Sequence, residues 1–136
     1  MAFVGGDVLE IAYNHPTLGA GAFSPKAAEE GTYNLGGFRN NDDANSVTAN
    51  GSNIRIMNNT RWFFEQVIAV DQNVEETQEA LVAIANSPVD ATWTITHKNG
   101  SVYRGTGSVV GEIDANVGNA TINLKVSGGG TMQKIQ

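Results

Sequence analysis

The chain has 136 residues, a length that suits one domain, and 40% of them are hydrophobic while only 16% are charged. The formal net charge is −6, and an acidic chain gains nothing from counterion release on nucleic acid, which argues against sequence-specific DNA binding. The absence of cysteine excludes disulfides, thiol catalysis and cysteine-based zinc sites.

Little regular pattern is present in the first part of the chain. Residues 8–11 (Val-Leu-Glu-Ile) predict a short strand, and residues 32–35 predict another. Between and after them, turn formers and polar residues predict two long loops, near residues 12–31 and 39–52. Loops of this length are uncommon in a compact domain, so we expect a partner to order them.

The pattern is sharper in the middle of the chain. Residues 61–70 predict a strand that carries Trp62, Phe64 and Ile68 on one face. A helix follows, with Asn73 as its N-cap and Glu76 at the capping-box spacing. This helix is expected to end before Pro88, because the residue before a proline avoids the α region.

The C-terminal part reads as strands. Residues 92–96 alternate between threonine and apolar side chains, and Asn99-Gly100 is a strong hairpin signal. Further strands are expected at 102–107, 109–114, 121–126 and 131–135, with Gly128-Gly129-Gly130 as a link before the last one. The sequence therefore predicts a mainly β (α+β) fold for a single domain, residues 1–136: an antiparallel β-sandwich or small barrel with one flanking helix.

No set of residues in the sequence assembles into a catalytic or metal-binding motif. The histidines, His15 and His97, are far apart, and His97 adjoins a hairpin turn, so structural or solvated roles are favoured for both. The pair Asp42-Asp43 lacks the glycine and closing glutamate of a calcium loop. We therefore expect no enzymatic activity, no cofactor and no bound metal.

The C-terminal third has a recognisable order of motifs. Trp-Thr-Ile-Thr at 93–96 is followed by Asn-Gly-Ser-Val-Tyr at 99–103, by Gly-Glu-Ile-Asp at 111–114, and by a Thr-Ile strand closing on glycine at 120–129. Over roughly residues 89–136 this pattern resembles the tail tube proteins of tailed bacteriophages, most closely those with contractile tails. The related tube proteins of injection systems, including the haemolysin-coregulated protein of type VI secretion, share the fold of that family.

The resemblance implies a structural role. Six subunits would form a ring in which their sheets join into a continuous inner β-barrel, and rings would stack into a tube. Genomic DNA would pass through the lumen without specific binding, and sheath, baseplate or initiator, and terminator proteins would be partners. The expected location is the virion tail, assembled in the host cytoplasm. No membrane is expected as a partner, since no apolar stretch approaches the roughly 20 residues of a membrane span.

Four residues are candidates for the wall of such a channel. Glu112 and Asp114 are expected on one face of a strand, and Thr121 and Asn123 on a polar face of another. An ordinary solvated outer face is an equal alternative for all four. Two alternatives to a phage tube also stay open: the tube subunit of a contractile injection or type VI-like system, and a monomeric β-sandwich that binds a glycan or protein.

Overall fold

The computed structural model describes residues 5–29, 31–70 and 77–135. It contains one helix and thirteen strands within those ranges. The elements are β1 (Val8–His15), β2 (Gly19–Phe23), β3 (Thr32–Asn34), β4 (Gly37–Asn40), β5 (Ser46–Val47), β6 (Asn53–Ile54), β7 (Met57–Thr60), β8 (Trp62–Ala69), α1 (Thr77–Asn86), β9 (Ala91–His97), β10 (Val102–Val109), β11 (Ala115–Asn116), β12 (Thr121–Gly128) and β13 (Gln133–Lys134).

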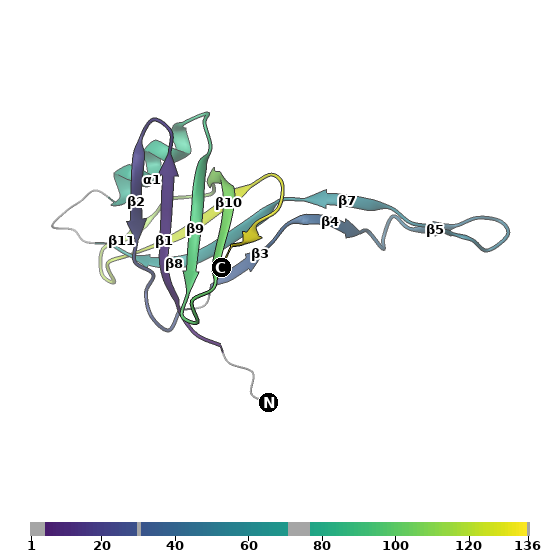
Figure 1. Cartoon of the computed structure of the whole chain (residues 1–136), viewed down its shortest axis with the longest axis horizontal. Coiled ribbons are helices and arrows are strands. Elements are labelled where there is room, and N and C mark those ends of the chain that lie inside the picture. The colour runs from purple at the N-terminus through teal and green to yellow at the C-terminus, as the bar shows by residue number, and fades with distance from the viewer. Residues whose placement is uncertain (1–4, 30, 71–76, 136) are drawn as a thin grey trace.

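Most strands form one antiparallel sheet in the order β2-β1-β9-β10-β12-β8-β3, with β11 on β12 and β13 on β10. The sheet curves so that one half, β2-β1-β9-β10, faces the other half, β12-β8-β3 (Figure 1). The two halves together form the body of the molecule. The prediction of a β-rich antiparallel fold with one helix is thus confirmed. Among the described residues, no helix is long and apolar enough to cross a membrane.

The core lies between the two halves of the sheet. Every second residue of β8, from Trp62 to Ile68, is buried, as the sequence pattern predicted. From the facing half, Trp93 and Ile95 of β9 are also buried. The indole nitrogen of Trp93 donates to the carbonyl of Gly107, 3.1 Å away, so this large ring is buried without an unpaired donor.

The two halves join where β10 crosses β12. A Cβ atom on Gly107 would clash with the carbonyl of Ser127, and one on Gly128 would clash with the carbonyl of Thr106. Only glycine allows two backbones to approach this closely. The prediction that Gly128 belongs to a link between strands is wrong, because Gly128 is the last residue of β12.

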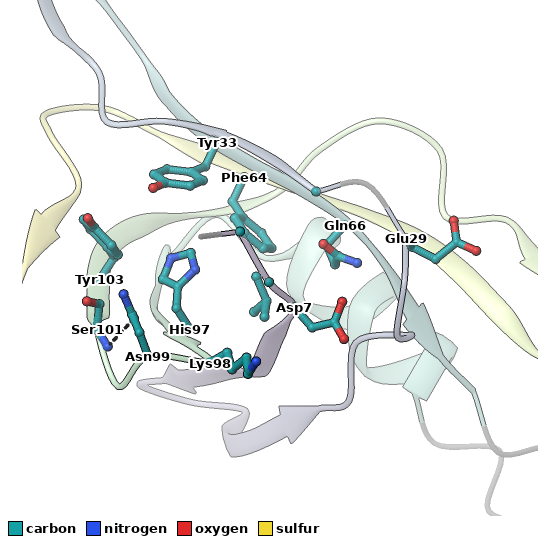
Figure 2. Close-up of a pocket in the computed structure, with 14 residues that line it drawn as sticks. Asp7, Glu29, Tyr33, Phe64, Gln66, His97, Lys98, Asn99, Ser101 and Tyr103 are labelled. Carbon is teal, nitrogen blue, oxygen red and sulfur yellow. Dashed lines mark hydrogen bonds between the residues drawn. The ribbon is translucent and has the colours of Figure 1, made fainter. Parts of the chain in front are cut away.

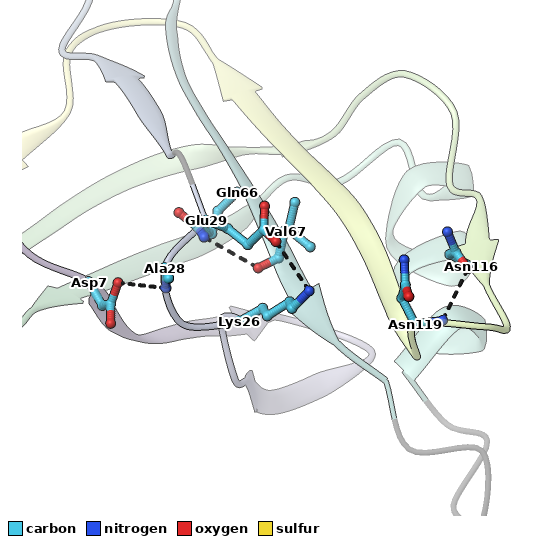
Figure 3. Close-up of polar contacts among 8 residues, drawn as sticks. All are labelled: Asp7, Lys26, Ala28, Glu29, Gln66, Val67, Asn116 and Asn119. Carbon is cyan, nitrogen blue, oxygen red and sulfur yellow. Dashed lines mark hydrogen bonds and ion pairs between the residues drawn. The ribbon is translucent and has the colours of Figure 1, made fainter.

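The long loop expected at residues 12–31 is largely replaced by a hairpin. Strand β1 continues to His15, and Gly19–Phe23 return beside it as β2. The chain then reaches the edge of β8, where the Ala69 amide donates to the Ser24 carbonyl. The Lys26 amide donates to the Val67 carbonyl at the same edge (Figure 3). Strand β2 was missed because its sequence, Gly-Ala-Gly-Ala-Phe, has almost no large side chains to show an alternation.

Helix α1 packs on the body through Leu81 and Ile84, which are both buried. The hydroxyl of Ser108 in β10 donates to the carbonyl of Ile84 over 3.2 Å and ties the helix to the sheet. The helix ends at Asn86, as the following proline predicted. Its predicted N-cap residues, Asn73 and Glu76, lie outside the described residues.

Candidate assembly surface

Residues 37–60 form a two-stranded ribbon, which we call the arm, that projects away from the body (Figure 1). Strand β4 pairs with β7 along its base, and β5 pairs with β6 nearer its tip. The loop predicted at 39–52 is therefore wrong in part, since the arm is a hairpin with short strands. All but three of its residues are exposed, the exceptions being Gly37, Asn45 and Ile56.

The arm exposes large apolar side chains. Phe38 is 64% exposed, Val47 69%, Ile54 41% and Met57 49%. Phe38 lies opposite Asn59 in the register while Met57 lies opposite Asn40, so Phe38 and Met57 share one face of the ribbon. A two-stranded hairpin in water is at best marginally stable, so this face is suited to being covered by another surface.

The charge of the chain is unevenly divided. The arm contains two arginines, Arg39 and Arg55, and two aspartates, Asp42 and Asp43, and its net charge is therefore zero. The formal charge of −6 resides in the rest of the chain. An arm without net charge can approach a second acidic copy without the general repulsion that two acidic bodies feel.

Contacts at the base of the arm fix the direction in which it leaves the body. Gly36 and Gly37 both have positive φ, 77° and 95°, which glycine tolerates at little cost. The Arg39 guanidinium then donates to the Gly36 carbonyl over 2.9 Å and to the Asn34 side-chain oxygen over 3.0 Å. This contact fixes the angle at which the arm leaves the body.

Two edges of the main sheet are open. Among the described residues, strand β2 pairs only with β1, and β3 pairs only with β8. Strand β2 carries no charge and no proline, which are the devices that usually protect an edge from pairing with another chain. The edge of β2 is therefore available to a strand of a second copy.

The structure separates the four predicted channel residues. Glu112 and Asp114 are exposed, but they lie in the connection after β10 and not in a strand, because Gly111 adopts a φ of 78° and ends the extended run. Thr121 is buried because it is paired with Asn116 of β11 on one side and with Ala69 of β8 on the other. The expectation of a strand at 109–114 and of an open Thr121 is thus wrong.

Asn123 alone of the four lies exposed on a strand. Its side-chain amide donates to a carboxylate oxygen of Glu65 on β8, 3.4 Å away. Lys125, two residues further along β12, lies over the ring of Phe63 at 5.4 Å from the centroid. The outer face of β8 and β12 is therefore polar with both signs of charge.

A cleft that the sequence did not predict lies beside β3. Its volume is about 450 Å³, and the rings of Tyr33, His97 and Tyr103 cluster along one wall with centroids 5.3 to 5.6 Å apart (Figure 2). We call it the aromatic cleft. Only the fold brings these rings together, since they come from β3, β9 and β10, and no local signal in the sequence could have found them.

The cleft perturbs two of its titratable groups. Burial lowers the pKa of His97 below its ordinary value of 6.5, so the ring stays neutral at neutral pH. Burial, and then the neighbouring Tyr103, raise the pKa of Tyr33 above 10.0. His97 is half-buried in this cluster, so of the structural and solvated roles that the sequence left open, the structural one describes it better.

The rim of the aromatic cleft carries carboxylates. Asp7, Glu29 and Lys98 all line it, and Lys98 lies next to Asp7 (Figure 2), whose carbonyl accepts from the Lys98 amide over 3.1 Å. Asp7 accepts a hydrogen bond from the Ala28 amide over 3.1 Å, and Glu29 pairs with Lys26 over 3.2 Å (Figure 3). Both carboxylates are thus held in place, and the residues that line the cleft have a net negative charge.

The other histidine is a buried structural residue. Amide groups of Thr17 and Leu18 donate to Nδ1 of His15, each over 3.1 Å. Nε2 therefore carries the proton and donates to the carbonyl of Val89, 3.0 Å away. Within the described part of the chain, no group of three or more histidine, aspartate or glutamate side chains is placed to hold a metal ion.

A comparison with protein-family models finds no family that matches this chain, and a comparison with curated proteins finds no significant match.

Proposed function

We propose that the chain is a structural subunit of a phage tail tube, in which six copies form a ring and the rings stack around a channel for DNA. The observation that carries this proposal is the arm, a ribbon without a core of its own that holds Phe38 and Met57 in solvent. A second copy is the covering surface that a subunit of a repeating assembly always has available.

The open edges of the sheet support the same conclusion. A ring needs two different surfaces on each subunit, one of which docks onto the other in the next copy. The β2 edge and the arm lie on different parts of the molecule (Figure 1), so both can be engaged at once. The acidic chain also suits a tube through which DNA slides, since it offers no net counterion release to hold the phosphates.

The alternative functions make different predictions about assembly and cargo. A tube of a contractile injection or type VI-like system would assemble in the same way and would differ in its cargo, which would be protein. A monomeric binding module would leave the arm uncovered at every protein concentration. An enzyme would require a set of catalytic side chains in one site, and the proposed structural function involves no such set.

Electron microscopy of the purified full chain across a concentration series tests the proposal. We expect hollow rings or stacked tubes that increase with concentration. A matched variant, in which Asn-Gly replaces residues 38–59, keeps the Gly37–Thr60 pair as a short hairpin. This variant should stay monomeric with an unchanged melting temperature, and a full chain that stays monomeric throughout would overturn the proposal.

A further inference from the structure

Arg55 of the arm lacks a role in its own chain. Its side chain is exposed, and it makes no hydrogen bond or ion pair with the described residues. Its neighbour Ile56 is held firmly, because the Ile56 amide donates to the Asn45 side chain over 2.7 Å and the Ile56 carbonyl accepts from Asn41 over 2.8 Å. The arm therefore presents a guanidinium from a fixed piece of backbone.

The aromatic cleft has the chemistry that binds a guanidinium. Aromatic faces attract cations within about 6 Å of the ring centroid, and Tyr33 is 43% exposed in the cleft wall. His97 stays uncharged beside it because burial disfavours its protonated form. Asp7 at the rim adds a carboxylate that an arginine pairs with, and Glu29 can pair with an arginine in exchange for Lys26.

We propose that Arg55 of one copy inserts into the aromatic cleft of a second copy, where it stacks on Tyr33 and faces the carboxylates of Asp7 and Glu29. This inference rests on the proposed assembly of the chain and names the surface that receives the arm. Within one molecule the arm points away from the body (Figure 1), and none of its residues lines the cleft, so the arm that enters the cleft belongs to a neighbour.

Arg55 is the better candidate of the two cations of the arm. Arg39 is already bound to Gly36 and Asn34 at the arm base, whereas Arg55 is not engaged. The cleft volume of about 450 Å³ holds a guanidinium with the stem of its side chain and leaves room for bridging water.

The absence of cysteine gives a direct test, because introduced cysteines will be the only thiols. Arg55→Cys in one preparation is mixed with Ser101→Cys in another, since Ser101 lines the cleft. Mild oxidation should give a disulfide-linked heterodimer, which requires Cα atoms within about 7 Å of each other. Ala115→Cys, exposed on β11 and not part of the cleft, is the matched control and should give at least about tenfold less heterodimer with Arg55→Cys.

Equal cross-linking to Ser101→Cys and Ala115→Cys, or none to Ser101→Cys, would overturn the inference. Charge variants give a second reading in the full chain: Arg55→Lys should weaken association a few-fold, and Arg55→Glu at least about tenfold. Tubes that form normally with Arg55→Glu would reject this contact and leave the tube function standing. A wild-type chain that never assembles would instead reject the function itself.

Discussion

The indole nitrogen of Trp62 donates a hydrogen bond to the carbonyl of Thr106, 3.1 Å away, across the join between the two halves of the sheet. The same ring covers Gly105, where a Cβ atom would lie 2.7 Å from Cε2 of the indole. Trp62 is fully buried. This one side chain thus ties β8 directly to β10, although β12 lies between these two strands in the sheet.

Gly105→Ala is therefore expected to destabilise the fold. The added methyl group meets a ring that has no room to move, and overpacking of this kind costs about 1 to 3 kcal/mol of unfolding free energy. Urea denaturation of the monomer measures the change. Gly129→Ala is the matched control, because nothing lies within 4 Å of its Cβ position, and it should change the unfolding free energy by less than about 0.5 kcal/mol.

His15→Leu should destabilise the monomer by about 2 kcal/mol or more. Leucine fills a similar volume but leaves the amides of Thr17 and Leu18 and the carbonyl of Val89 without their partner. Thermal melting and denaturant titration both measure this loss. Thr17→Val, which removes only the hydroxyl contact to Nδ1, should cost less; an equal or larger loss from Thr17→Val would contradict the role given to His15.

The aromatic cleft predicts how stability depends on pH. The folded chain protonates His97 at a lower pH than the unfolded chain does, so stability should fall as the pH drops below about 6.5. The folded chain keeps the Tyr33 proton to a higher pH, so stability should also fall as the pH rises above about 10. Urea midpoints at a series of pH values measure both effects.

His97→Phe separates the histidine effect from that of the carboxylates. It keeps a ring in the cluster with Tyr33 and Tyr103 and removes the titration. The fall in stability between about pH 6.5 and pH 5 should become shallower in this variant, whereas the alkaline fall should remain. An unchanged acid profile would show that other groups control it.

Substitutions on the apolar face of the arm should act on association and not on folding. Phe38→Ser and Met57→Ser each remove apolar surface that the monomer leaves exposed, so the melting temperature of the monomer should stay the same. If a second copy buries this face, each change should weaken association by about tenfold or more. Sedimentation velocity measures this, and Asn53→Ser, another exposed arm substitution, should leave association unchanged.

Strands with large alternating side chains could be predicted from the sequence. The burial of Trp62, Phe64 and Ile68 follows directly from a period of two, and so does the alternation in β9. The Asn99-Gly100 turn also lies where the pattern placed it, with a φ of 90° at Gly100. In these segments local chemistry and the final fold agree.

The arm could not be predicted as a whole because its pairing is made by backbone. Most of its side chains are small or polar and stay in solvent, so no hydrophobic period marks its strands. One signal was present: Asn50-Gly51 occupies the tip, where Gly51 has a φ of 91°. Together with Gly36-Gly37 at the base, it could have indicated a hairpin where a loop was expected.

Burial that depends on neighbours distant in the chain could not be predicted from the sequence either. Thr121 reads as a surface residue from its own strand, and only the pairing with Asn116 and Ala69 on either side covers it. The aromatic cleft likewise needs Tyr33 to meet His97 and Tyr103, which lie more than sixty positions further along the chain. Tertiary pairing, not propensity, decides such positions.

The order of the strands has a consequence for synthesis. Strand β1 must wait for β9 before it has its long-range partner, while the strands of the arm pair with one another in the part of the chain that the structure describes. The 37 positions from Thr60 to His97 take roughly 2 to 7 s to translate at the usual rate. The β1–β2 hairpin and the arm thus leave the ribosome before the body can close, and because two-stranded hairpins are marginally stable alone, each nascent chain presents them unfinished to its neighbours on a polysome.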